Sequence, residues 1–480
     1  MNGKGLKSLY SWRFPRALAY MLQASEYRTP QYLKWLLRTR DFSRVQYRRT
    51  LERTIKAKLL EIFLATGMTL EIIVGLVIIG YGISSSILWL IILGFVLIIA
   101  YPLIWALLVV LPLEAGRLLV VLPAQQREIT ASEKIFAEHP GIKIAVAGSY
   151  GKTTMKELLK TVLSEGKTVA ATIANNNVST EHAKFAKRLK GNEEVLIIEY
   201  GEGAPGDVKR FTRVTKPTYG FITGLAPAHI DKYKTLKVAG DDIFSLADFL
   251  QDENIYVNAD SLATKEYLKE GYKTYSENGV GKWKVKDVKI SIEGTSFRLL
   301  GDNQTINIHS KLIGRHQIGA LSASAALAID LGLSIKEIEF GIAKCEPFEH
   351  RMQPRYMSGA WIIDDSYNGN IEGIKAGTAL LKELPAKRKI YVTPGLVDQG
   401  TYTQEVHLEM GHLIASADPN LVVLINNSVT DYIRDGLNES GFKGELQIVN
   451  DPLAYYSNLE QTLALGDLLM MQNDWPDNYV

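Results

Sequence analysis

A run of 42 residues without a charged side chain, residues 72–113, constrains the fold of this chain more than any other feature. About 20 apolar residues cross a bilayer as a helix, so the run is long enough for two spans. Residues 80–86 contain two glycines and three serines, which favour a turn. We therefore expect a transmembrane helical hairpin within residues 58–116, with spans at about residues 62–83 and 87–111. A buried hairpin of a soluble protein is the alternative.

Basic residues flank this hairpin on both sides. Five of them lie between Arg48 and Lys58, Arg117 and Arg127 follow, and the connecting turn is uncharged. The positive-inside rule then places both ends of the hairpin in the cytoplasm. We expect a two-span protein of the cytoplasmic membrane, with both termini and the domains after the hairpin in the cytoplasm. We expect no secretory signal, because the apolar run begins too late and is too long.

The N-terminal arm, residues 1–57, is strongly basic. Residues 1–60 contain 14 Lys and Arg against three acids, a local charge of +11. Because the whole chain has a net charge of +2, the rest of it sums to about −9. Such an arm suits anionic lipid or nucleic acid. Its mixture of apolar and basic positions at residues 32–40 predicts a helical arm on the membrane surface, and we expect no nucleic-acid partner.

Residues after Arg127 have the composition and pattern of an α/β protein. Short apolar runs predict strands at Lys143–Ala147, Glu194–Glu199, Thr218–Thr223, Asn254–Asn258, Trp361–Asp364, Lys389–Thr393 and Leu421–Ile425. Helical patterns lie at Thr153–Leu163, Ile243–Leu250 and Gly319–Leu333, and residues 284–308 are richer in strand signals with a turn at Gly301–Asn303. The single cysteine, Cys345, excludes an internal disulfide and a zinc site built from cysteines.

The strongest local signal is a glycine-bearing loop between a strand and a helix. It reads Gly148, Ser149, Tyr150, Gly151, Lys152, Thr153 and Thr154. Backbone N–H groups and a helix N-terminus in this setting face an anion, and a lysine neutralises phosphate oxygens. A threonine hydroxyl after the lysine is a ligand for Mg²⁺. The loop therefore predicts nucleotide phosphate binding, although its spacing is shorter than that of the common P-loop; an ordinary strand–helix turn is the alternative.

Several separated motifs resemble the Mur ligase family, the ATP-dependent amide ligases of peptidoglycan precursor synthesis, over about 340 residues. Besides the phosphate loop they are Thr172–Asn177, Ile197–Gly201, Ile222–His229, Gly314–His316, His350–Met352 and Ile363–Asn370. The last is similar to the motif of the family branch that adds D-alanyl-D-alanine. The resemblance implies a central P-loop ATPase domain at residues 128–346 and a C-terminal Rossmann-like α/β domain at residues 347–480, meeting at a hinge near residues 344–349.

The resemblance also implies ATP and Mg²⁺ and a role for each motif residue. Lys152, His229 and Arg351 would be catalytic, and Thr153, Glu199 and His229 would hold the metal. The nucleotide would contact residues 148–154, Arg351, Asp365, Tyr367 and Asn370. Asn175 and Asn177 would hold the substrate or the metal's water shell. Taken singly, each has an ordinary explanation: a solvated strand-end Glu199, a hydrogen-bonded loop His229, an ion pair of Arg351 with Glu349, or a turn cap at Asp364–Asp365.

Three departures from the family pattern stand out. Gly240 occupies the position of a lysine that is carbamylated in many members, and Asp241 or Asp242 are candidates for the missing carboxylate. Gln317 and Ala320 stand where asparagines usually lie near the adenine. The N-terminal domain that holds the UDP-sugar part of the substrate is replaced by the hairpin.

These departures leave three functions open. The first is a ligase joining a peptidoglycan precursor to an amine such as a D-amino-acid dipeptide. The second is a ligase on the same fold that takes a lipid-linked or other carboxylate substrate. The third is a membrane-tethered nucleotide-binding module without catalysis. The joint presence of Lys152, Glu199, His229 and Arg351 favours an enzyme.

Overall fold

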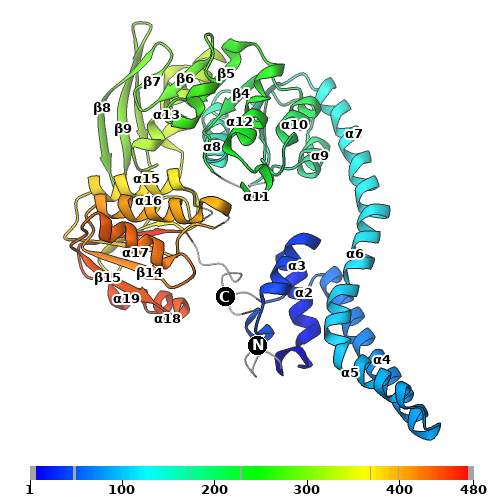
Figure 1. The fold of residues 1–480 in the computed structure, drawn as a ribbon. Coiled ribbons are helices and arrows are strands. Elements are labelled where there is room, and N and C mark those ends of the chain that lie inside the picture. The colour runs from blue at the N-terminus through cyan, green and yellow to red at the C-terminus, as the bar shows by residue number, and fades with distance from the viewer. Residues whose placement is uncertain are drawn as a thin grey trace. The chain divides into compact units, whose positions relative to one another are not determined.

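The computed structural model describes residues 7–46, 50–174, 176–227, 230–367, 369–397 and 399–473. The described residues divide into two compact units, one formed by those up to 125 and the other by those from 126 to 473. The first unit is helical, whereas the second contains two mixed sheets with helices on their faces (Figure 1).

Two long apolar helices form the hairpin of the first unit. Helix α4 spans Ile55–Ser84 and α5 spans Leu88–Leu108, so the chain reverses at residues 85–87, where the turn was predicted. Helix α4 begins earlier than expected because the Thr54 side chain caps it by accepting from the Ala57 N–H. The two helices approach closely at Gly75 and Gly94, where a Cβ on Gly94 would lie 2.6 Å from the Gly75 carbonyl oxygen.

Both helices are long and apolar enough to cross a membrane. After α5 the helix continues through α6 (Val110–Gly116), a π-helical turn (Arg117–Val121) and α7 (Leu122–Glu138). Only 22% and 17% of the two most apolar windows are buried inside the protein, whereas a core helix of a soluble protein is mostly buried. Their exposed faces are formed by residues such as Ile73, Leu76, Phe95 and Ile99. The two helices are therefore candidate membrane spans.

The N-terminal arm is helical and packs within its own unit. Helices α2 (Phe14–Ala24) and α3 (Thr29–Arg38) share one apolar cluster with α4 and α5. The Tyr32 hydroxyl donates to the Ala106 carbonyl at 2.7 Å. Of the apolar residues that predicted a lipid-facing arm, Tyr32 and Leu36 are buried against protein, whereas Leu37 is 82% exposed.

The larger sheet of the second unit has ten strands in the order β10-β9-β8-β7-β6-β5-β4-β1-β3-β2. Strands β2 (Val169–Ala171), β3 (Val195–Glu199), β1 (Ile142–Ala147), β4 (Tyr219–Ile222), β5 (Ile255–Asn258) and β6 (Lys273–Ser276) pair in parallel. Strands β7 (Gly279–Val280), β8 (Trp283–Ser291), β9 (Gly294–Gly301) and β10 (Gln304–Ser310) extend it antiparallel. Because the carboxyl ends of parallel strands meet at one edge, the loops after β1, β3 and β4 are neighbours.

Alternate side chains of β1 pack into two separate apolar cores. Ile144 and Val146 face a core shared with α8 (Lys152–Leu163), α13 (Ile318–Asp330) and α14 (Ile335–Ala343). Ala145 and Ala147 face a core shared with α9 (Ser179–Arg188), α10 (Asp207–Thr215) and α12 (Leu236–Phe244). This two-sided burial explains why β1 has a continuous apolar run rather than an alternating one.

The smaller sheet has six strands in the order β11-β12-β16-β13-β14-β15. These are β11 (Gln353–Met357), β12 (Ala360–Asp365), β13 (Arg388–Thr393), β14 (Leu421–Ile425), β15 (Glu445–Val449) and β16 (Asp467–Gln472). All pairs are parallel except the edge pair β11–β12. Helices α15 (Ile371–Glu383), α16 (Thr403–Ser416) and α17 (Thr430–Glu439) cover one face around Ile363 and Tyr391. Residues 344–352, with Pro347, connect α14 to this sheet.

The predicted strands and the helices near residues 153 and 319 lie within two residues of the observed boundaries, with one exception. The helix predicted at Gly319–Leu333 ends at Asp330, three residues early, where a turn follows. The helix expected at Ile243–Leu250 is wrong. Helix α12 instead begins after Thr235, whose side chain accepts from the Val238 N–H, and it ends at Phe244. A short 3₁₀ turn at Ala247–Phe249 follows. The cap sets this helix, and Gly240 within it weakened the sequence signal.

Candidate functional site

The phosphate loop lies between β1 and α8 and depends on two glycines with positive φ. Gly148 has φ +141°, and a Cβ there would lie 2.4 Å from the Thr223 hydroxyl. Gly151 has φ +73° and directly precedes Lys152, the first residue of α8. The positive end of the α8 dipole therefore faces the loop, as anion binding requires.

Tyr150 packs against the loop after β4. Its ring lies on Gly224, where a Cβ would lie 2.2 Å from a ring carbon, so no larger residue fits at position 224. Burial raises the pKa of Tyr150 to about 12. Thr223 donates to the Tyr150 carbonyl, and the Ser149 N–H donates to the Gly224 carbonyl at 2.8 Å. The loop after β4 thus holds the phosphate loop in shape.

Lys152 is bound within the protein by two oxygen atoms. Its Nζ lies 2.6 Å from the Glu202 carboxylate and also donates to the Gly148 carbonyl. The exposed fractions of the two side chains are 11% and 4%. Glu202, on the loop after β3, was not singled out from the sequence, because nothing local to it indicates a contact 50 residues away.

Glu199 ends β3 and lies at the centre of a polar cluster. Its Oε1 accepts from the Thr153 hydroxyl at 3.2 Å and from the Asn177 side-chain amide at 3.2 Å. Its Oε2 lies 3.2 Å from the Lys156 Nζ, but no donor among the described residues is aligned for a hydrogen bond. Glu199 is 1% exposed and Lys156 is fully buried.

This cluster fits a magnesium ion. A buried carboxylate oxygen without an aligned donor, beside a threonine hydroxyl, is the hard oxygen donor set that Mg²⁺ prefers. Thr154 follows in the first turn of α8. Two of the residues that the sequence assigned here, Asn175 and His229, lie outside the described residues. Within the described ranges, no group of three His, Cys, Asp or Glu side chains forms a preassembled metal cluster.

The two aspartates beside Gly240 have other partners. Asp242 is buried, accepts from the Gly206 N–H at 2.9 Å and accepts from the Tyr233 hydroxyl at 2.9 Å. Burial raises the pKa of the Asp242 carboxyl. Asp241 accepts from the Tyr267 hydroxyl at 3.2 Å. Asp242 therefore anchors the loop that carries Glu202.

A second group of predicted site residues lies on the smaller sheet. The Arg351 guanidinium lies over the Tyr367 ring at 4.6 Å from its centroid. Asp365, at the end of β12, accepts from the Met352 N–H at 3.2 Å and from the Gln472 side chain at 2.8 Å. Burial raises the pKa of Asp365 to about 6, against the lowering effect of these bonds and of Arg351. Asn370 caps α15 by accepting from the Gly373 N–H at 3.0 Å.

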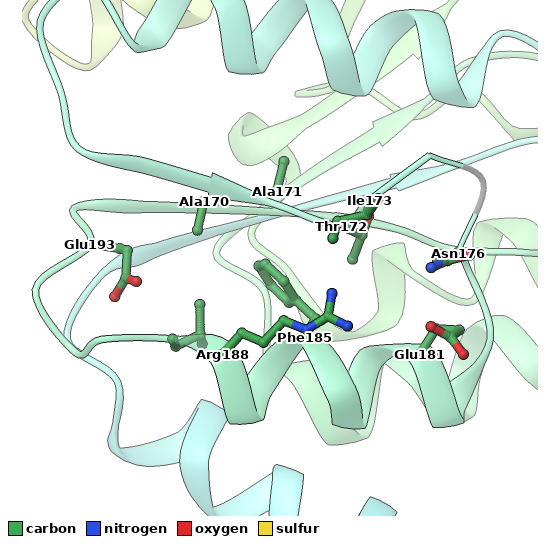
Figure 2. Close-up of a pocket in the computed structure, with 10 residues that line it drawn as sticks. Ala170, Ala171, Thr172, Ile173, Asn176, Glu181, Phe185, Arg188 and Glu193 are labelled. Atoms are coloured by element: carbon green, nitrogen blue, oxygen red, sulfur yellow. The ribbon is translucent and has the colours of Figure 1, made fainter.

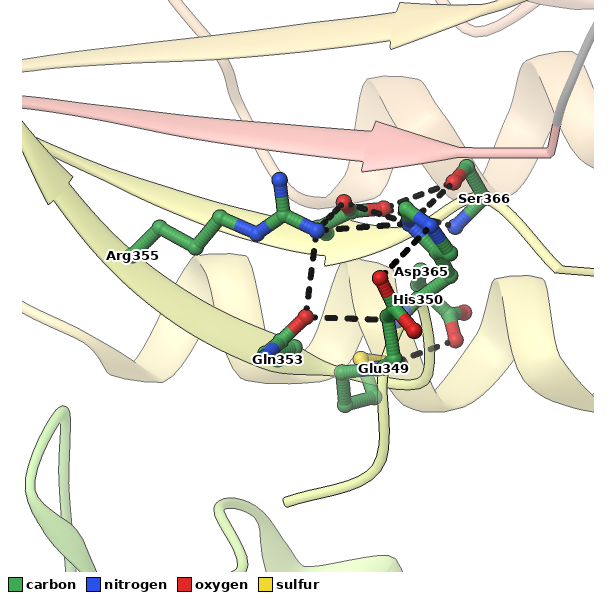
Figure 3. A network of polar contacts seen from close by, with 8 residues as sticks. Glu349, His350, Gln353, Arg355, Asp365 and Ser366 are labelled. Atoms are coloured by element: carbon green, nitrogen blue, oxygen red, sulfur yellow. Dashed lines mark hydrogen bonds and ion pairs between the residues drawn. The ribbon is translucent and has the colours of Figure 1, made fainter.

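A polar network beside this group includes His350, Arg355 and Ser366 (Figure 3), and all three contact Asp364. Its carboxylate is 1% exposed and lies 2.9 Å from His350 Nδ1 and 2.8 Å from Arg355 Nη2. The Ser366 hydroxyl donates to the other oxygen at 2.7 Å. The network fixes His350, the neighbour of Arg351. Arg355 was not singled out from the sequence; it lies on β11, which pairs with β12.

Residues that come just before Gln317 connect the larger sheet to the smaller one. Arg315 forms a two-pronged contact with Glu383 of α15, with Nη2 at 2.9 Å from the carboxylate. Ile313 packs in the core of the smaller sheet. Gln317 and Ala320 stand at the start of α13, and the Gln317 amide lies 2.9 Å from His316 Nε2.

A pocket that sequence analysis did not predict lies between the edge strand β2 and α9 (Figure 2). It includes Thr172, Ile173 and Asn176 from the asparagine-rich segment. Phe185 and Leu189 contribute apolar walls, and the Arg188 side chain extends along α9 on the pocket side. The segment that carries Asn177 therefore contacts Glu199 at one end and lines this pocket with the residues before it.

Known proteins resemble this chain in sequence. Residues 146–328 match the Mur ligase middle domain. The chain is 28% identical to UDP-N-acetylmuramoyl-tripeptide–D-alanyl-D-alanine ligase of Synechocystis over 335 residues, which cover 68% of this chain and 71% of the relative. The protein of the same name from Escherichia coli is 25% identical over 297 residues, covering 60% and 65%. The chain therefore spans about two thirds of the length of these relatives.

A solved structure shares the fold. The MurF ligase from Thermotoga maritima in complex with ADP aligns with a TM-score of 0.62 at 19% identity, covering 73% of this chain and 80% of that one. The phosphate loop, the Glu199 cluster and the ten-stranded sheet all fall in or beside the matched middle domain. The chain therefore contains a region, residues 146–328, that matches the Mur ligase middle domain, and it is similar in sequence to these ligases.

Proposed function

We propose that this chain is an ATP-dependent amide ligase of peptidoglycan precursor synthesis. It activates a substrate carboxylate as an acyl phosphate and joins it to an amine such as D-alanyl-D-alanine, with release of ADP and phosphate. The observation that carries the proposal is the phosphate loop, with Thr153 in contact with the buried Glu199, inside a Mur ligase middle domain. The names of the relatives supply the substrate class.

The reaction has two balanced steps. A carboxylate oxygen of the acceptor attacks the γ-phosphorus of ATP, and the bond to the β,γ-bridging oxygen breaks to release ADP. The amine nitrogen then attacks the acyl carbon, loses a proton, and expels inorganic phosphate. Because negative charge concentrates on the transferring group, the enzyme needs cations around it.

The central domain, residues 128–346, supplies the first of these cations. Lys152 neutralises phosphate oxygens, and the loop 148–154 holds the phosphates through backbone N–H groups. Thr153 and Glu199, together with His229, would hold Mg²⁺, which would offset the charge of the phosphates. Asn175 and Asn177 position the acceptor or the water around the metal, and Asn177 already contacts Glu199.

The C-terminal domain, residues 347–480, supplies the rest. Arg351 reaches the transferring phosphate, Asp365 accepts from the ribose hydroxyls, and Tyr367 and Asn370 line the base. The described contacts place Arg351 beside Tyr367, and Lys152 beside Glu202. We propose that the two domains close over ATP by bending at residues 344–349, which brings both groups to one triphosphate.

Residues 1–57 and the hairpin at 58–116 attach the enzyme to the cytoplasmic membrane. The exposed apolar faces of α4 and α5 support this part of the proposal, together with the basic flanks of the hairpin. Both termini and the ligase domains are then cytoplasmic, where ATP is available. We propose no nucleic-acid partner.

The same helices favour a second candidate substrate. An enzyme held at the bilayer meets lipid-linked precursors at high local concentration, and no UDP-sugar domain occupies the described residues before α7. A lipid-linked carboxylate acceptor, with the same chemistry, is therefore the alternative to the soluble precursor.

A coupled assay tests these candidates. The full chain in detergent, with ATP and Mg²⁺, is given UDP-muramoyl-tripeptide or its lipid-linked equivalent, each with and without D-alanyl-D-alanine. ADP release that requires both acceptor and amine, with an amide product identified by mass, supports the ligase. Tight ATP binding without turnover on either acceptor would instead support the non-catalytic module.

A further inference from the structure

Glu202 forms an ion pair with Lys152, the ammonium group that the phosphates of a nucleotide must bind. Its Oε2 lies 2.6 Å from the Lys152 Nζ, and both side chains are almost fully buried. The ammonium has three donors, of which one is directed at Glu202 and another at the Gly148 carbonyl. A phosphate oxygen that binds Lys152 must therefore compete with a carboxylate that is already in place.

The protein fixes the loop of Glu202 on both sides of this residue. On one side, the Gly201 N–H donates to the Asn177 carbonyl at 2.7 Å. On the other side, the Gly203 N–H donates to Asp207 at 3.2 Å, and the Tyr233 hydroxyl donates to the Ala204 carbonyl at 3.1 Å. The contact with Lys152 is thus built into the backbone.

Further along the loop, Asp242 holds Gly206 through its N–H at 2.9 Å. Asp242 also binds Tyr233, so one buried pair supports two points of the loop. Glu202 therefore has little freedom to leave the phosphate loop when a nucleotide arrives.

The need to neutralise the Glu202 carboxylate determines which partner it takes after nucleotide binding. Once the phosphates take Lys152, the Glu202 carboxylate is a buried anion next to other anions, an arrangement that is costly without a cation. Lys156 is already bound and cannot neutralise Glu202. Its Nζ lies 3.2 Å from Glu199 and also contacts Glu157 and the Ala174 carbonyl. The described residues therefore offer Glu202 no second ammonium, whereas a divalent cation arrives with the nucleotide.

We propose that Glu202 exchanges cations during nucleotide binding. It neutralises Lys152 in the nucleotide-free protein and passes to the divalent cation that accompanies ATP. The exchange makes binding selective for the metal complex of the nucleotide. Metal-free ATP takes Lys152 from Glu202 and brings no cation to neutralise the Glu202 carboxylate. This inference rests on the proposed binding of ATP at Lys152, but not on amide formation.

The test measures binding only, on the full chain in detergent by calorimetry. Metal-free ATP in EDTA and a non-hydrolysable ATP analogue with Mg²⁺ are titrated into the wild-type protein and into Glu202→Gln. The variant keeps the shape of the side chain but removes its charge. Glu293→Gln, at an exposed hairpin position, is the control for the loss of one negative charge.

Removal of the competing anion is expected to tighten metal-free ATP binding about tenfold, the equivalent of 1.4 kcal/mol. The gain in affinity on adding Mg²⁺ is expected to shrink in Glu202→Gln and to stay at the wild-type value in Glu293→Gln. A Glu202→Gln protein that binds metal-free ATP no more tightly than wild type, or that keeps the full magnesium gain, overturns the exchange. A Glu202→Asp variant, which withdraws the carboxylate from Lys152, gives an intermediate result if the exchange is right and the wild-type result if it is wrong. Normal binding by wild type without any amide product would contradict the ligase reaction alone.

Discussion

The ring of Tyr267 covers Gly240 so closely that a Cβ at position 240 would lie 2.4 Å from the phenolic oxygen. The same ring stacks on Phe244, with centroids 4.4 Å apart. Position 240 is where the resemblance to the Mur ligase family implies a lysine, and the Tyr267 ring occupies the space that a side chain there would need.

This contact predicts an unusual response to a helix substitution. Gly→Ala inside a helix normally stabilises it by about 1 kcal/mol. Gly240→Ala is expected to destabilise the protein by about 1–3 kcal/mol instead, because it overpacks Tyr267. Denaturant unfolding of the full chain measures the difference. Gly373→Ala, in α15, is the matched control, since its nearest contact is an ordinary 3.9 Å. Combining Gly240→Ala with Tyr267→Leu should restore stability; an additive loss would argue against the contact.

Substitutions of Lys152 and of Arg351 are expected to have different effects on ATP affinity and on turnover. Lys152→Ala removes a charged contact to the phosphates, and should weaken ATP binding about 10- to 100-fold. Arg351→Ala should lower kcat about 100-fold or more while ATP affinity changes only slightly, because Arg351 acts when charge develops on the transferring group. Calorimetry and steady-state kinetics separate the two. Equal losses of affinity and turnover in Arg351→Ala would contradict its role.

Asp365 predicts a pH dependence of nucleotide binding. Burial raises its pKa to about 6, so its carboxyl is mostly protonated at pH 5 and mostly ionised at pH 7. The ionised form accepts stronger hydrogen bonds from ribose hydroxyls. ADP affinity is therefore expected to rise about tenfold from pH 5 to pH 7, with a midpoint near 6. The Asp365→Asn protein should lack this component; identical profiles for the two proteins would remove Asp365 from the binding site.

The second unit is expected to fold without the first. Phe136 on α7 is fully buried against the ligase core, and Glu128 pairs with Lys187 of α9 at 2.7 Å. A chain starting at residue 126 should therefore be soluble without detergent and keep ATP affinity within about twofold. It should also lose preference for a lipid-linked acceptor over a soluble one. Aggregation of this fragment, as measured by light scattering, would show that the first unit is needed for folding.

The sequence predicted features that depend on neighbouring residues. The hairpin, its turn at residues 85–87, β1 and the phosphate loop all follow from local composition and from the placement of glycine and serine. It did not predict β2 or β16, which are recognised only through their partners. Strand β16 comes last in the chain but pairs between β12 and β13, a placement that no local pattern encodes.

The same distinction applies to the site. Motif order predicted Glu199 and Thr153, which the fold brings together. Glu202, Arg355 and Tyr267 were not predicted, because their importance comes from contacts with residues 9 to 50 positions away. Asp242 was one of two candidates for the carboxylate missing at Gly240, and in the structure its carboxylate anchors a loop.

The fate of one oxygen atom tests the central claim most directly. The acceptor that supports turnover is labelled with ¹⁸O in its reacting carboxylate, and the products of a single turnover with ATP, Mg²⁺ and amine are analysed by mass. Activation as an acyl phosphate predicts one ¹⁸O in the released inorganic phosphate for each amide formed. Amide formation with unlabelled phosphate, or with the label in AMP, would contradict the account.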